Sequence, residues 1–137
     1  MTQQTVLPDP GATTLPAEDE ARGAGVVALG LVVAAAAHVP STGHHLAEAP
    51  YMGAAFVGFT LACVVLLLAL SSRVSRAALL ASASLCAAAV GAYVATRLVA
   101  MPGLAHDVGA WWEPWGVVAI AAETVVAFTA TRMVAAS

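Results

Sequence analysis

Long apolar stretches alternate with short polar segments along most of the chain. The apolar stretches cover residues 24–40, 50–70, 77–101 and 114–133. A helix needs about 20 mostly apolar residues to cross the roughly 30 Å hydrocarbon core of a bilayer. We therefore predict an all-α fold in which residues 24–134 form one bundle of four transmembrane helices.

Residues 1–23 differ from the rest of the chain. They contain three prolines and an acidic cluster at residues 18–20. Such a segment buries too little apolar surface to fold by itself. We predict a disordered tail before the bundle.

The overall composition supports a membrane protein. Hydrophobic residues make up 61% of the 137 residues and charged residues 9%, with a mean hydropathy of +0.87. Soluble domains average about 45–50% apolar and about 25% charged residues. The formal net charge of -3 also leaves no basic surface for nucleic acid. A water-soluble globule and a nucleic-acid-binding protein are therefore both disfavoured.

The arginines predict the orientation of the bundle. Arg22, Arg73, Arg76 and Arg132 all fall on the side that holds both termini and the turn between the second and third spans. Positively charged residues concentrate on the cytoplasmic side of membrane proteins. We therefore expect a multi-pass protein of a bacterial plasma membrane with both termini in the cytoplasm.

Imidazole and carboxylate groups gather at the opposite, external side. The candidate ligands are His38, His44, His45, Glu48, His106 and Glu113. If His45 opens a helical turn, Glu48 lies on the same face three residues later. Such groups suit zinc, copper or iron, and haem is a further candidate. We predict an external site for a metal ion or a small polar ligand. The spacing matches no established metal motif, so the alternative is interfacial polar residues that hydrogen-bond the loops.

A second group of polar residues lies within the spans. Glu123 is roughly 13 Å into the fourth span by helix rise, and an acid at a helix centre costs about 2.5 to 3.5 kcal/mol. We expect it to pair with Arg97 and to accept a hydrogen bond from Tyr93. The three residues could form a proton relay, a site for a substrate head group, or a structural contact that fixes helix register.

Small residues recur every four positions on two of the spans, a spacing that lets transmembrane helices approach closely. The two series are Ala54, Gly58 and Ala62, and Ala87, Gly91 and Ala95. We expect these faces to be compatible with a tight bundle.

Motifs for catalysis are missing from the sequence. The chain has no GxSxG motif and no glycine-rich phosphate loop. Cys63 and Cys86 stand alone inside apolar runs, so they form no CxxC motif. We predict that the protein is not an enzyme.

The order of these features resembles a family of small four-span membrane proteins common in actinobacteria. The resemblance covers about residues 24–130 and implies the four-helix architecture, without implying an activity. The chain differs from the family pattern at residues 105–112, where the resemblance implies an acidic, Gly- and Pro-rich loop. The residues that carry it are His38, the HLAE of residues 45–48, Pro50, Gly53, Arg97, Met101, Pro102, Glu113, Pro114, Gly116 and Glu123.

The sequence supports more than one class of function. Our leading hypothesis is a protein that binds a metal ion or a small polar ligand at the external cluster. The alternatives are a proton-coupled transport or conducting module that uses Glu123 and Arg97, and an accessory subunit of a larger membrane complex. Transport would require an oligomer, because four short helices enclose little space.

Overall fold

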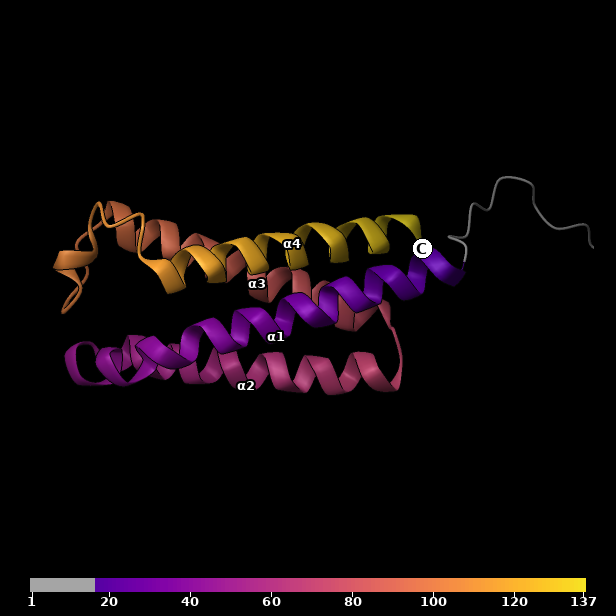
Figure 1. Cartoon of the computed structure of the whole chain (residues 1–137), viewed down its shortest axis with the longest axis horizontal. Helices are drawn as coiled ribbons and strands as arrows, with labels where there is room; N and C mark the ends of the chain where they lie inside the picture. Colours follow the sequence, from indigo (N-terminus) through magenta and orange to yellow (C-terminus); the bar gives the residue numbers. More distant parts are fainter. Residues whose placement is uncertain (1–16) are drawn as a thin grey trace, which may run out of the picture.

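The computed structural model describes residues 17–137, and within them the regular secondary structure consists of helices (Figure 1). Its elements in order are α1 (Ala17–Glu48), α2 (Pro50–Ser72), α3 (Arg76–Leu98), the short 3-10 helix η1 (Ala105–Asp107) and α4 (Pro114–Ala136). Within residues 17–137, the four α-helices are each long and apolar enough to cross a membrane. The predicted all-α fold is confirmed, and the candidate spans suggest a multi-pass membrane protein.

Helices α2, α3 and α4 begin at residues that favour a helix N-terminus. Pro50 and Pro114 are the first residues of α2 and α4, a position where the missing proline N–H costs nothing. The side chain of Ser75 caps α3 by accepting a hydrogen bond of 3.2 Å from the backbone N–H of Ala78. These boundaries agree closely with those expected from the sequence.

Helix α1 is longer than its apolar pattern predicts. It passes through Pro40 and ends at Glu48, so the predicted end at Pro40 is wrong. Proline is tolerated inside a transmembrane helix because neighbouring helices and polar side chains compensate the disturbed backbone. Residues 17–23 are also helical, and the remainder of the predicted tail, residues 1–16, lies outside the described residues.

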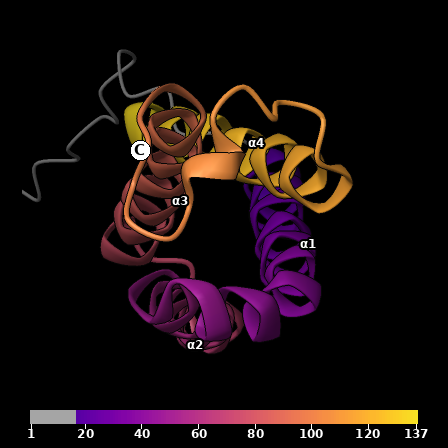
Figure 2. The same cartoon turned by 90° about the vertical axis from the view of Figure 1, so that its left-hand side faces the viewer.

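The helices are not packed equally against one another. Helix α1 packs extensively against α2 and α4, and α3 packs extensively against α4, whereas α2 and α3 touch only slightly. Figure 2, which looks along the bundle, shows α2 and α3 as separate neighbours although a short turn joins them. The side of the bundle between α2 and α3 is therefore less tightly packed than the other sides.

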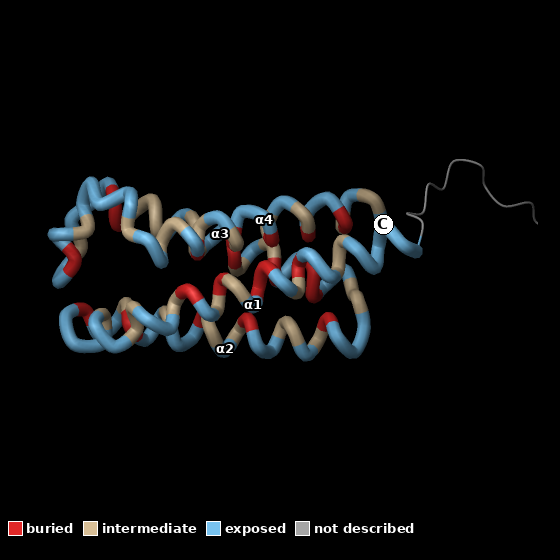
Figure 3. Tube along the Cα trace, viewed as in Figure 1, coloured by how far each residue is buried: buried red, intermediate tan, exposed pale blue. Residues whose placement is uncertain are grey.

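Buried residues are distributed over all four described α-helices (Figure 3). Val27, Leu31, Cys63, Cys86 and Val126 are fully buried and form part of one continuous core. Large apolar side chains elsewhere on the helices point outward. This outward apolar surface suits lipid, because hydrocarbon is the solvent around a transmembrane helix.

The small-residue series predicted for helix contacts do not mediate them within the described chain. A methyl group added at Gly58 or Gly91 would meet no atom of residues 17–137 within 4 Å. Close approach occurs at other glycines instead: Gly30 faces Val126, and Gly53 faces Leu46. Gly58 and Gly91 are exposed, whereas Gly30 and Gly53 are buried against neighbouring helices.

The two ends of the bundle differ in chemistry. The start of α1, the α2–α3 turn and the chain's C-terminus share one end (Figure 1), and this end carries Arg22, Arg73, Arg76 and Arg132. The connections from α1 to α2 and from α3 to α4 lie at the opposite end. We name the second end the histidine end, after His44, His45 and His106.

Candidate functional site

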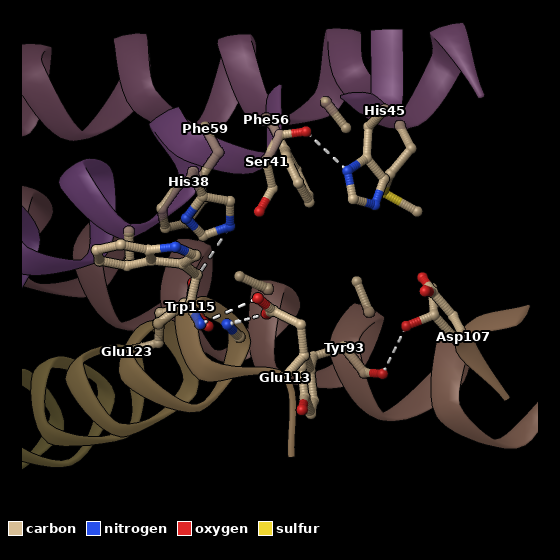
Figure 4. Close-up of a pocket in the computed structure, with 18 of the residues that line it drawn as sticks. His38, Ser41, His45, Phe56, Phe59, Tyr93, Asp107, Glu113, Trp115 and Glu123 are labelled. Carbon is tan, nitrogen blue, oxygen red and sulfur yellow. Dashed lines mark hydrogen bonds and ion pairs between the residues drawn. The ribbon is translucent and has the colours of Figure 1, made fainter. Parts of the chain in front are cut away.

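A cavity of about 710 Å³ extends into the bundle from the histidine end. Its walls come from α1, α2, α3, α4 and the segment around η1 (Figure 4). Most of the residues singled out in the sequence line it, with Glu48 the exception. The predicted site residues in its wall are His38, His44, His45, Tyr93, Arg97, His106, Glu113 and Glu123.

Glu123 is buried deep in this cavity wall, with 2% of its surface exposed. Its Oε1 atom lies 3.7 Å from Nε2 of His38 on α1, too far for a hydrogen bond, and has no hydrogen-bond partner among the described residues. The other ring nitrogen of His38, Nδ1, donates to the carbonyl of Ala34 at 2.8 Å. The ring is held between Phe56 and Phe59, with centroid distances of 4.7 and 4.5 Å. A buried carboxylate and an imidazole therefore face each other across a short gap (Figure 4).

Arg97 has a different partner from the one expected. Its Nη1 atom lies 3.1 Å from Oδ2 of Asp107, and its guanidinium carbon lies 4.5 Å from the centre of the Tyr93 ring. The Tyr93 hydroxyl donates to the carbonyl of Trp111 at 2.8 Å. The predicted Arg97, Tyr93 and Glu123 cluster is therefore wrong in its pairing, although all three residues line the cavity.

The loop after α3 explains why Arg97 pairs with Asp107. The backbone N–H of Gly109 donates to the carbonyl of Arg97 at 3.0 Å, which folds the loop back over the end of α3. Gly109 has a φ of +80°, a conformation that glycine adopts without strain. No sequence pattern indicates this pair, because the loop between α3 and η1 has no regular geometry.

The exposed His44, Glu48 and His106 come together at the mouth of the bundle. Nε2 of His44 lies 3.0 Å from Oε2 of Glu48, one helical turn away, and Nε2 of His106 lies 3.7 Å from the same oxygen. One ligand atom from each of the three residues lies within 4.8 Å of the others. Two of these residues come from α1 and one from η1, so the cluster exists only when the loop after α3 is folded over α1.

The remaining predicted ligands are engaged elsewhere. His45 directs Nδ1 to the carbonyl of Ser41 at 2.8 Å, and His38 faces Glu123. The expected pairing of His45 with Glu48 is wrong: the His45 ring bonds the carbonyl of Ser41 and packs 4.8 Å from the Phe56 ring, and His44 contacts Glu48 instead.

Glu113 caps a helix. Its carboxylate accepts hydrogen bonds from the backbone N–H groups of Trp115 and Gly116 in the first turn of α4. The negative charge also suits the positive end of the helix dipole.

Loss of the Glu113 cap is expected to lower stability without changing metal binding. Glu113→Ala should reduce the free energy of unfolding by about 1 kcal/mol, measured by denaturation of the detergent-solubilised protein. Glu113→Asp keeps a carboxylate at the cap and should lose less. A loss of metal affinity in well-folded Glu113→Ala would contradict this assignment.

Comparison with known proteins found no matching family model, no matching curated protein and no matching solved structure.

Proposed function

We propose that this chain is a multi-pass protein of a bacterial plasma membrane that binds a divalent transition-metal ion through His44, Glu48 and His106. The observation that carries the proposal is the convergence of these ligand atoms to within 4.8 Å. The role is binding rather than catalysis. Membership of the small actinobacterial four-span family that the sequence resembles is part of the same proposal.

The ligand types support a transition metal. Two imidazoles and one carboxylate form a set that zinc, copper(II) and iron(II) accept, with bonds of about 2.0 to 2.2 Å. Exposed side chains at the end of α1 and in η1 can close the remaining distance by rotation. Three protein ligands leave further coordination positions for water or a small ligand. The cluster therefore fits a site that exchanges its ion with the surrounding solution.

The charge distribution supports an external position for this site. The arginines outside the cavity lie at the opposite end of the bundle, and positive residues favour the cytoplasmic side. At the histidine end, Trp112 is 87% exposed, as suits a side chain at the membrane–water boundary. Both termini are then cytoplasmic, and the metal cluster faces the outside of the cell.

Titration of Zn²⁺ and Cu²⁺ into the metal-stripped, detergent-purified chain tests the proposal. We expect the wild type to bind one ion, and His44→Ala and His106→Ala each to lose affinity by about tenfold or more. His45→Ala is the matched control, because His45 lies next to the cluster in sequence but its Nδ1 contacts the carbonyl of Ser41. Absence of binding by the wild type, or an equal loss in His45→Ala, would refute the metal site.

A further inference from the structure

The charged side chains that line the cavity differ in how well their charges are compensated by partners. Arg97, 7% exposed, is paired with Asp107 at 3.1 Å, and Glu113 is engaged by the first turn of α4. Glu123 is more deeply buried than either, yet its Oε1 atom has no hydrogen-bond partner within residues 17–137. Removing a carboxylate from water without a compensating partner is costly. Nε of Arg97 also lacks a hydrogen-bond partner within residues 17–137, but the charge of Arg97 is compensated by Asp107. Glu123 is therefore the charged group of the cavity with most to gain from a ligand.

His38 adds a second acceptor beside this carboxylate. Because a carbonyl can only accept, the 2.8 Å contact with Ala34 requires the hydrogen of a neutral His38 ring to be on Nδ1. The Nε2 atom then presents its lone pair toward Oε1 of Glu123, 3.7 Å away. A hydrogen-bond donor between these two acceptors could satisfy both of them. The carboxylate favours a donor with positive charge.

The part of the cavity wall around His38 and Glu123 is apolar and aromatic. Phe56, Phe59 and Trp115 stand close to His38 and Glu123 in Figure 4, and all of them line the cavity. Aromatic faces attract cations, most strongly where water is excluded. The volume of about 710 Å³ lies inside the range of about 300–1,000 Å³ that is typical of small-molecule sites. These walls suit an organic body better than a hydrated metal ion.

The wall of the cavity is least tightly packed between α2 and α3. Its lining residues Ala55 and Gly58 on α2, and Ala88 and Ala92 on α3, are exposed, at the interface where the helices touch least. In a membrane this side faces lipid, so a molecule dissolved in the bilayer can reach the cavity without crossing water. An apolar body on the ligand is then required for access as well as for fit.

From these observations we infer that the cavity binds an organic ammonium ion with an apolar body, whose N–H group lies between Glu123 and His38. An anionic ligand is disfavoured, because the guanidinium of Arg97 is already neutralised by Asp107. The inference does not depend on the metal proposal, since the two sites use different residues.

Calorimetric titration with naphthylmethylammonium tests the inference, using the full chain in phosphatidylcholine nanodiscs and empty discs as the baseline. We expect saturable binding at one molecule per chain. Glu123→Gln should weaken it by about tenfold or more, because the charge that compensates the ammonium is removed. Glu48→Gln is the matched control: it should keep ammonium binding and lose Zn²⁺ binding, whereas Glu123→Gln should keep Zn²⁺ binding.

A second variant keeps the test decisive if Glu123→Gln folds poorly. Ala92→Phe adds bulk at an exposed position of the cavity wall, away from the core, and should block the ammonium while Zn²⁺ binding persists. Neutral naphthylmethanol should bind at least about tenfold more weakly than the ammonium. Equal binding of the alcohol, or undiminished ammonium binding in folded Glu123→Gln, would overturn the inference.

Discussion

Arg97→Ala is expected to lower the free energy of unfolding by about 3 to 5 kcal/mol, the range for removing one partner of a buried ion pair. The variant leaves Asp107 without its guanidinium partner, 3.1 Å away in the wild type, and removes the cation that stacks on Tyr93. Because Asp107 belongs to η1, the loss should also loosen the loop over the end of α3. Unfolding in mixed detergent micelles, followed by circular dichroism, measures the change.

The control for this variant is Arg132→Ala. Arg132 is exposed, and its guanidinium lies 5.8 Å from the Phe128 ring, so its loss should change stability by less than about 0.5 kcal/mol. The double variant Arg97→Met, Asp107→Leu removes both charges and should recover much of the stability lost in Arg97→Ala. Equal stability of Arg97→Ala and Arg132→Ala would show that the ion pair contributes nothing.

Gly53→Ala is expected to destabilise the fold by about 1 to 3 kcal/mol through overpacking. A methyl group at Gly53 would lie 2.6 Å from the backbone nitrogen of Leu46 and 2.7 Å from its Cα atom. Backbone atoms cannot rotate away, so the last turns of α1 must shift from α2. This shift displaces His44 and Glu48, and we therefore expect weaker Zn²⁺ binding together with a lower unfolding midpoint.

Gly91→Ala is the matched control within a helix interior. The added methyl group would meet no atom of residues 17–137 within 4 Å. Alanine is favoured over glycine in a helix by roughly 0.5 to 1 kcal/mol, so the variant should be as stable as the wild type or slightly more stable. If Gly53→Ala and Gly91→Ala were equally stable, the contact between α1 and α2 at Gly53 would not be close.

Most of the predicted site residues line one cavity, but the sequence could not predict which of them contact one another. Glu123 and Arg97 both line the cavity, which the sequence did not predict. Their pairing was wrong because it depends on helix rotation and on the path of the loop after α3. A local pattern specifies the face of a helix on which a residue lies, whereas the neighbour of that face depends on the packing of the whole bundle.

Among the predicted metal ligands, one pair follows from helix geometry and one residue depends on tertiary packing. His44 and Glu48 pair through helix geometry alone, one turn apart on α1, and only the expected end of that helix at Pro40 obscured this pair. His106 joins them from a loop some sixty residues later in the chain. Its position depends on the folding of that loop and has no counterpart in sequence spacing.

The amino-acid sequence by itself determined the helical class, the apolar segments long enough to cross a membrane, and the separation of arginines from histidines. These properties follow from composition and from hydrogen bonding within each helix, since a backbone in lipid must satisfy its own polar groups. Only the tertiary structure decided the loose contact between α2 and α3, the cavity beside it, and the position of Glu123 opposite His38. Those features arise from side-chain packing between helices, where shape and rotation, rather than hydrophobic periodicity, select the contacts.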